Sequence, residues 1–359
     1  MNRAVDLLVV GLGPGGASAA RAAARAGLRV VGVDKKRRPG EPVQCAEFVP
    51  RPLVSEPQVR AAHVQDIHGM RTFHPEGRLT VTEHFPGLMI DRRRLDAGIA
   101  AEAAEAGATL HYATRLERLD TEAGEAWFHG PEGEFSVRFR LLIAADGPRS
   151  PVARSLGLPE LAHVFTRQYT VPLREPFATT DIWLSPDYPG GYAWLFPKGE
   201  VANLGLGLDK RFSGDLKTPL DRLHRQLQAE GRVGGEILGH TGGEIPVAGL
   251  RPELVWEDKV LFVGDAAGLT HPITGAGIAP AILSGELAGQ AAAEYLAGDG
   301  EALEDYQEEI RDRYQGSLAH AVARRALLER AFQARQTPEP STFQATWIAF
   351  DEYHRDDAA

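Results

Sequence analysis

Residues 6–36, "DLLVVGLGPGGASAARAAARAGLRVVGVDKK", decide the fold of this chain. An apolar run ends at Val10, an alanine-rich segment follows a cluster of glycines, and Gly27 separates that segment from a second apolar run. Short apolar runs bounded by glycine are typical of buried strands, and the alanine-rich segment favours a helix. Because a strand–helix–strand unit of this kind builds a parallel sheet, the stretch predicts a Rossmann-like α/β domain.

The turn between the first strand and the helix carries the pattern G-x-G-x-x-G at Gly11, Gly13 and Gly16. The first glycine allows a tight turn, the second lets a pyrophosphate approach the backbone, and the third lets helix and strand pack closely. Pro14 and Gly15 complete the loop, and the helix N-terminus that follows can stabilise phosphate charge. In this context the pattern predicts a dinucleotide site.

Asp34 closes the second strand, where a carboxylate can accept hydrogen bonds from a ribose diol. The next residue, Lys35, either reaches the adenosine half of the dinucleotide or is solvated. These residues alone do not separate NAD from FAD.

Two later segments favour FAD. The stretch "VLFVGDAAGLTHPITGAGI" places Gly264 and Asp265 at the end of a buried strand, and "AADG" places Asp146 and Gly147 at the end of another. An acid at such a position can bind a ribose or ribityl hydroxyl, and a helix start can stabilise negative charge on a reduced ring. An NAD site needs no second cradle so far downstream, whereas the longer FAD does, so we predict non-covalent FAD. Four further cofactor-binding positions are predicted at the helix start after Asp265: Pro272, Gly275, Gly277 and Ile278.

The stretch "GGYAWLFPKGEVANLGLG", residues 190–207, is rich in aromatic residues. Because side chains alternate along a strand, Tyr192, Trp194 and Phe196 should lie on one face. Taken from the residues alone, the stretch favours an ordinary core strand.

The three glycine and aspartate motifs together resemble those of FAD-dependent oxidoreductases with the p-hydroxybenzoate hydroxylase fold. Within that group, the aromatic stretch resembles the Y-x-W-x-F-P-x7-G-x-G motif of the geranylgeranyl reductase family, and "VQCAEFVP" resembles that family's cysteine-containing loop. The positions that carry the aromatic motif are Tyr192, Trp194, Phe196, Pro197, Gly205 and Gly207. The resemblance implies that these aromatics border an isoprenoid pocket, with Phe196 and Pro197 nearer the flavin ring.

The same resemblance implies that Cys45 and Ala46 lie in a loop over the flavin and that Arg92 lies against FAD. Cys45 is a candidate catalytic residue, and the alternative is a small buried apolar group. Arg93 and Arg94 offer the same charge as Arg92, so the assignment can slip by a residue or describe a solvated basic run.

The function implied is an FAD-dependent reductase that hydrogenates isolated C=C bonds of prenyl chains of the geranylgeranyl type. Hydride would come from flavin N5 together with a proton, and NAD(P)H or ferredoxin would be the external reductant. The alternatives are an FAD-dependent monooxygenase of a lipophilic or aromatic substrate and a non-catalytic flavin or lipid carrier. A halogenase is disfavoured, because those enzymes use a lysine in a region where this chain has none between Lys36 and Lys198.

Composition excludes other classes of function. The 359 residues carry a net charge of -10, which argues against a nucleic-acid partner. The single cysteine excludes an intramolecular disulfide, and the 12 histidines show no metal-ligand spacing, so no metal is predicted. No apolar stretch reaches the roughly 18 residues of a membrane span. We expect a cytoplasmic protein, with peripheral contact at the inner membrane face as an open alternative.

The order of elements predicts a discontinuous FAD-binding domain, a β-rich antiparallel substrate domain and a helical tail. The FAD-binding domain is expected at 1–50, 90–162 and 246–300, and the substrate domain at 51–89 and 163–245. The C-terminal helical tail, 301–359, is expected to pack against the FAD-binding domain, and a lining role in a lipid tunnel or contact with a bilayer is the alternative.

Overall fold

The strand–helix–strand unit predicted from residues 6–36 is present as β2 (Leu7–Val10), α1 (Pro14–Arg25) and β3 (Val30–Val33) in the computed structural model, which describes residues 3–51 and 57–355. These strands belong to a six-stranded sheet of order β19-β20-β13-β2-β3-β9. All neighbours in it are parallel except β19 and β20. The remaining strands of this sheet are β9 (Thr109–His111), β13 (Leu141–Ala144), β19 (Val255–Trp256) and β20 (Val260–Phe262).

The central parallel strands β2, β3, β13 and β20 are buried along their whole length, because helices cover the sheet, whereas β9 at its edge is partly exposed. Helix α1 packs against α6 (Ile278–Ala297) and α3 (Arg92–Glu105). The approach of α1 and α6 depends on glycine, since a Cβ on Gly285 would lie 2.0 Å from the Gly15 carbonyl oxygen. The helix start that the sequence predicts near Gly277 is present, since α6 begins at Ile278.

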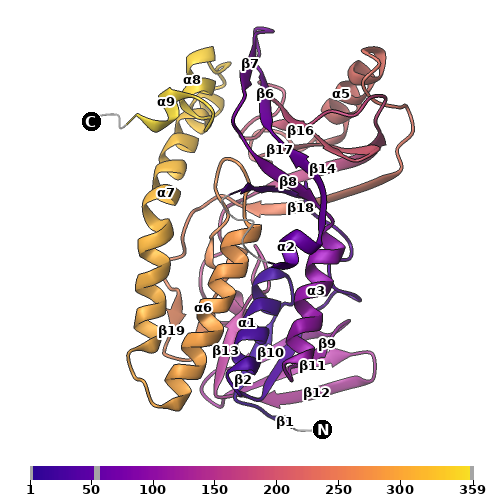
Figure 1. The fold of residues 1–359 in the computed structure, drawn as a ribbon. Helices are drawn as coiled ribbons and strands as arrows, with labels where there is room; N and C mark the ends of the chain where they lie inside the picture. The colour runs from indigo at the N-terminus through magenta and orange to yellow at the C-terminus, as the bar shows by residue number, and fades with distance from the viewer. Residues whose placement is uncertain (1–2, 52–56, 356–359) are drawn as a thin grey trace.

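A smaller sheet of order β1-β12-β11-β10 lies beside this domain at the lower end of Figure 1. Its strands are β1 (Arg3–Ala4), β10 (Arg115–Asp120), β11 (Glu125–Gly130) and β12 (Gly133–Arg138). Strands β11 and β12 form an antiparallel hairpin before the buried β13. Short elements join these layers: α2 (Pro57–Ala61), α4 (Pro151–Ser155) and the 3-10 helix η2 (Gly264–Ala267).

A seven-stranded sheet of order β18-β14-β17-β16-β15-β6-β7 forms the opposite end of the molecule (Figure 1). It is antiparallel except where β15 pairs with β6. Its strands are β6 (Gly69–Phe73), β7 (Leu79–Thr82), β14 (His163–Pro172), β15 (Thr179–Trp183), β16 (Ala193–Lys198), β17 (Val201–Leu208) and β18 (Gly239–Pro246). Helix α5 (Lys217–Ala229) packs on β14 and β17. The predicted substrate domain, 51–89 and 163–245, contains all of this sheet except Pro246, the last residue of β18. The division of the chain into domains stays a prediction.

A three-stranded sheet connects the two ends of the molecule. It has the order β4-β8-β5, with bounds β4 (Phe48–Pro50), β5 (His63–Ile67) and β8 (Gly87–Ile90). Because β4 follows the Cys45 loop directly, this sheet fixes where that loop ends.

The C-terminal tail contacts both large sheets. Helix α7 (Ala302–Gln333) first packs on the parallel sheet, where the Tyr306 hydroxyl donates to the Phe262 carbonyl at 2.6 Å. Its distal end and the short helices α8 (Pro340–Ala345) and α9 (Asp351–His354) reach the seven-stranded sheet, where Leu328 and Phe343 join a cluster with residues of β16. The tail therefore packs on the parallel sheet, where the sequence analysis expects it, and also on the seven-stranded sheet.

No helix among residues 3–51 and 57–355 is long and apolar enough to cross a membrane. Over the same residues, no group of histidine, cysteine, aspartate and glutamate side chains has the arrangement of a metal site.

Candidate active site

The glycine turn before α1 has the geometry that a pyrophosphate needs. Gly11 has φ +94°, and a Cβ there would lie 2.2 Å from the Ala145 carbonyl oxygen. A Cβ on Gly16 would lie 1.8 Å from the Gly11 carbonyl oxygen, whereas nothing lies within 4 Å of one on Gly13. Gly13 is also the N-cap of α1 and supplies no side-chain cap. The turn is thus closed by two glycines and open at the third, beside the positive end of a helix.

Asp34 lies at the end of β3 with its carboxylate fixed by two backbone amides. The Leu12 amide donates to Oδ2 at 2.7 Å and the Lys36 amide donates to Oδ1 at 2.7 Å. Each oxygen keeps a second lone pair for a hydroxyl donor. Lys35 beside it is exposed.

Asp146 has an unused acceptor. Its Oδ2 accepts from the Val152 amide at 2.8 Å, while its buried Oδ1 has no hydrogen-bond partner in the described residues. Desolvation raises the pKa of Asp146 to about 6, although the Val152 bond opposes the shift. Since buried polar atoms are almost always paired, this oxygen fits a hydroxyl of a bound molecule. Gly147 follows in the left-handed region with φ +88°.

The third motif places Asp265 beside the start of α6. The Thr270 hydroxyl donates to Asp265 Oδ1 at 2.6 Å, and a Cβ on Gly277 would lie 2.4 Å from that hydroxyl oxygen. Gly277 is the N-cap of this 20-residue helix and supplies no side-chain cap. Desolvation raises the pKa of Asp265, while Thr270 and Arg92 lower it. Gly264 and Gly275 both have positive φ, at +57° and +72°, which fits the tight path of the segment.

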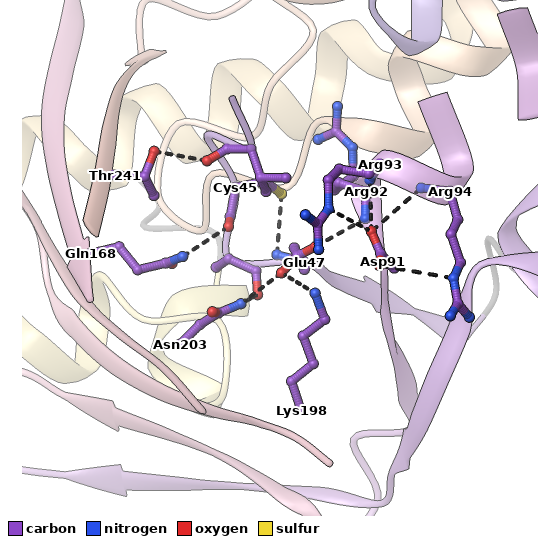
Figure 2. Close-up of polar contacts among 12 residues, drawn as sticks. Cys45, Glu47, Asp91, Arg92, Arg93, Arg94, Gln168, Lys198, Asn203 and Thr241 are labelled. Atoms are coloured by element: carbon purple, nitrogen blue, oxygen red, sulfur yellow. Dashed lines mark hydrogen bonds and ion pairs between the residues drawn. The ribbon is translucent and has the colours of Figure 1, made fainter. Parts of the chain in front are cut away.

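The Cys45 loop is held against the seven-stranded sheet by side chains of the sheet (Figure 2). The Thr241 hydroxyl donates to the Val43 carbonyl at 2.7 Å, and the Gln168 amide donates to the Cys45 carbonyl at 3.2 Å. The Trp194 indole N–H donates to Gln168 Oε1 at 3.1 Å. The aromatic strand and the cysteine loop therefore form one hydrogen-bonded unit.

Arg92 is the inward-facing arginine of the three. Its side chain is 15% exposed and makes two bonds to the buried Asp96, whereas Arg93 and Arg94 are 59% and 67% exposed. Burial opposes its charge, but Asp96 and Cys45 raise the pKa of Arg92. The Arg92 backbone amide also donates to Glu47 Oε1 at 2.9 Å, which ties the start of α3 to the cysteine loop.

The aromatic side chains lie on one face of the strand, as alternation predicts, and all three join one apolar cluster. The two ends of the aromatic strand make different contacts, and the predicted order relative to the flavin ring stays a prediction. Tyr192 contacts the third motif, because its hydroxyl donates to the Thr274 carbonyl at 2.6 Å, while Phe196 packs on Phe48 with ring centroids 5.9 Å apart. Pro197 lies farther along β16, opposite Ala202.

The expected open pocket wall is covered by protein. Trp194 and Phe196 are 5% and 7% exposed, and Trp347 of the tail packs edge-on against Tyr192 with ring centroids 4.8 Å apart. A cavity of about 30 Å³ remains between Tyr192, Trp194 and the loop 272–275. The larger groove, about 790 Å³, lies at the end of α7 and touches none of the predicted site residues, so we place the site at the smaller cavity, where the motifs meet.

Sequence reasoning missed the polar residues that hold the cysteine loop. They carry no short motif of their own, and their partners are distant in the chain. They are Glu47, Gln168, Lys198, Asn203 and Thr241. The available signals were the quoted stretches themselves, because Lys198 and Asn203 lie inside the aromatic stretch and Glu47 lies inside "VQCAEFVP".

The chain matches known proteins along most of its length. A sequence model of the geranylgeranyl reductase catalytic domain matches residues 166–244. A digeranylgeranylglycerophospholipid reductase from Methanocella arvoryzae is 35% identical over 348 residues, which cover 89% of this chain and 86% of that protein. The chain belongs to the geranylgeranyl reductase family.

Further relatives in this family agree. A digeranylgeranylglycerophospholipid reductase 1 from Methanopyrus kandleri is 36% identical over 86% of this chain and 88% of its own. The crystal structure of a geranylgeranyl bacteriochlorophyll reductase-like protein from Thermoplasma acidophilum covers 98% of this chain and 93% of its own, with a TM-score of 0.83 and 26% identity. A probable FAD-dependent monooxygenase from Pseudomonas aeruginosa, at 22% identity and a TM-score of 0.69 over 92% of this chain and 99% of its own, shares the fold.

As a member of the geranylgeranyl reductase family, the chain is an FAD-dependent oxidoreductase, and the predicted α/β fold class is confirmed. Its described residues fit FAD. The open Gly13 position, the unpaired Asp146 Oδ1 and the two helix N-termini without side-chain caps are all features that a bound dinucleotide satisfies.

Proposed function

We propose that this chain hydrogenates isolated C=C bonds of prenyl chains of the geranylgeranyl type. The observation that carries the proposal is the pair of contacts made by the aromatic strand. Tyr192 reaches the third motif through Thr274, and Trp194 reaches the cysteine loop through Gln168. The names of the archaeal relatives, which specify a digeranylgeranyl glycerophospholipid, support this class of substrate.

We assign FAD to the three motifs. Gly11, Gly13 and the start of α1 would hold the pyrophosphate, and Asp34 a ribose hydroxyl. Asp146 and Asp265 would accept from further hydroxyls, and the start of α6 would stabilise negative charge on the reduced ring. When bound and reduced, FAD supplies the hydride.

The surrounding residues would exclude water from an unpolarised alkene. The aromatic cluster around Trp194 and Phe196 is buried, which suits an apolar chain and strengthens the electrostatic interactions of the few polar groups inside. The cavity is only about 30 Å³. Side chains of the apolar cluster that the tail and the aromatic strand form together must therefore move before a prenyl chain can enter.

We assign the proton to Cys45. The thiol of Cys45 is partly buried, and Gln168, which binds the Cys45 carbonyl, also accepts from the Trp194 indole of the aromatic strand. A thiol in this position can give its proton to the carbon next to the one that receives hydride.

NAD(P)H or ferredoxin is proposed as the external reductant, and peripheral contact with a membrane as the way to reach a lipid substrate.

The experiment is an anaerobic turnover of the purified FAD-loaded chain, reduced with dithionite, with a digeranylgeranyl glycerophospholipid. Mass spectrometry should show a gain of two hydrogen atoms for each reduced bond, and the yellow absorbance should return as the lipid is consumed. An oxygenated product that forms only in air would instead identify a monooxygenase. Unchanged lipid recovered with the protein would identify a carrier.

A further inference from the structure

Glu47, two residues after Cys45, is a buried carboxylate with three hydrogen-bond donors (Figure 2). The Arg92 backbone amide donates to Oε1 at 2.9 Å. The Lys198 ammonium and the Asn203 amide donate to Oε2 at 2.7 and 3.0 Å. The Glu47 side chain is 5% exposed and that of Lys198 is 16% exposed, so both charges of the ion pair lie largely out of water. Lys198 directly follows Pro197 of the aromatic motif.

The backbone of Glu47 is held in a conformation that L residues disfavour. Its φ is +67°, in the left-handed region, where glycine is the usual residue. Glycine would adopt this conformation more easily but would lose all three side-chain contacts. The contacts therefore explain why a non-glycine residue stands at this position.

The conformation of Glu47 bears directly on the thiol. Its backbone N–H donates to Cys45 Sγ at 3.2 Å, and Asn203, which holds the carboxylate, also donates to the Ala46 carbonyl at 3.1 Å. An N–H aimed at sulfur stabilises the thiolate. Because the chain between the thiol and Glu47 is a single residue, fixing the carboxylate fixes the direction of the sulfur.

We propose that Glu47 is the positioning residue of Cys45: paired with Lys198, it fixes the loop that carries the thiol, and the charge balance of the pair sets how readily the thiol ionises. Figure 2 shows Arg92 and the Glu47–Lys198 pair near Cys45, and Tyr192 also interacts electrostatically with the thiol. The inference rests on the proposed function only in one respect, the role of the Cys45 thiol as proton donor. The Glu47–Lys198 pair acts on the thiol whether or not a lipid is present.

The test is the pH dependence of Cys45 alkylation by iodoacetamide in the FAD-loaded chain. Cys45 is the only cysteine, so the label reports on this thiol alone. Lys198→Met leaves the Glu47 carboxylate uncompensated, and the midpoint of the profile should rise by about half a pH unit. Glu47→Gln leaves the Lys198 ammonium uncompensated, and the midpoint should fall by about half a pH unit. Arg93→Ala is the control: it removes an exposed charge of α3, next to Arg92, and should leave the alkylation profile unchanged.

Opposite shifts in the two variants distinguish the proposal from a merely structural role, which would move both profiles in the same direction. Glu47→Ala, which removes every side-chain acceptor, should in addition raise the alkylation rate at high pH about threefold or more, because the loop is released. Midpoints that stay at the parental value, or that move together, would overturn the inference.

The FAD content of each variant shows whether it is folded, and if Glu47→Ala fails to retain FAD the two conservative variants still decide the matter. If the alkylation midpoints shift in opposite directions but the chain reduces no lipid, the result supports the role of the Glu47–Lys198 pair and rejects the proposed function. If the chain reduces the lipid but the alkylation profiles do not shift, the result supports the proposed function and rejects the role of the Glu47–Lys198 pair.

Discussion

At the scale of the residue, Gly205 explains the spacing of the aromatic motif. It pairs with Trp194 across β16 and β17, and a Cβ at this position would lie 2.4 Å from the indole ring. The indole can therefore lie across β17 only if residue 205 has no side chain. Gly191, just before Tyr192, has a similar role, since its Cβ would lie 2.0 Å from the Gly207 carbonyl oxygen.

We expect Gly205→Ala to destabilise the chain by about 1–3 kcal/mol, because the indole must move out of a packed cluster. The free energy of unfolding from urea denaturation measures this. Gly207→Ala is the matched control, since its Cβ would lie 3.5 Å from the Thr166 methyl, an ordinary contact. Equal losses in the two variants would show that the indole does not require the glycine.

Asp146 should make the FAD-free chain less stable as pH rises. Desolvation raises its pKa in the folded state to about 6 from the ordinary value of 3.8, so the folded state binds this proton more tightly than the unfolded state. Stability linked to this group is present below the unfolded pKa and is lost between pH 4 and pH 6. We expect Asp146→Asn to be more stable than the parent by about 1–3 kcal/mol at pH 7 and to match it near pH 4.

Denaturation of the FAD-free parent and variant at both pH values measures the difference for Asp146. A constant offset across the range would mean that the carboxyl does not titrate in this window.

At the scale of the element, the tail helices complete the apolar cluster over the aromatic strand. Trp347 is 3% exposed, packs against Tyr192, and has no partner for its indole N–H in the described residues. Phe343 and Phe350 join the same cluster, and Phe350 also packs on His74 with ring centroids 5.1 Å apart. The segment after α7 is thus part of the site's surroundings.

Trp347→Ala should destabilise the chain by about 3–5 kcal/mol, since it removes a buried aromatic ring. It should also enlarge the space next to Tyr192 and change the rate of prenyl reduction. Trp127→Ala is the control: Trp127 is half-buried in the small sheet under Arg118, and its loss should leave lipid reduction unchanged. Normal turnover by the Trp347 variant, once corrected for folded protein, would separate the tail from the substrate site.

At the scale of the whole molecule, the cofactor site joins segments from three parts of the chain. The turn before α1, the end of β13 and the start of α6 meet because β2, β13 and β20 are neighbours in one parallel sheet. The carboxyl ends of parallel strands lie at one edge of a sheet, where ligands bind in this class of fold. The aromatic strand belongs to the seven-stranded sheet and contacts the third motif through Tyr192, and the cysteine loop is hydrogen-bonded to the same sheet.

Because one FAD molecule should span these segments, its retention should depend unequally on the two acidic ends. Asp265→Ala removes an acceptor beside a helix start and frees Thr270, whereas Asp34→Ala removes an acceptor at the adenosine end. We expect the Asp265 variant to lose more FAD. Heat release and chromatography after gel filtration measure bound flavin per chain, and equal retention would contradict these roles.

The sequence by itself determined the local structure and the positions that chemistry requires. The strand–turn–helix unit, the long helices from Arg92 and Ile278, and the shared face of Tyr192, Trp194 and Phe196 all follow from periodicity and glycine placement, which act within a few residues. The family also follows from such short motifs. These features are visible in one dimension because their physical causes are local.

Only the tertiary structure decided which side chains meet. It selected Arg92 from three adjacent arginines, because only that one packs onto Asp96 and the cysteine loop. It brought Lys198 to Glu47 across 151 positions of the chain. It also placed the tail over the aromatic strand, which the sequence predicts only as the border of a pocket. No local pattern encodes such contacts, since each depends on how separate elements pack and on which buried charge finds a partner.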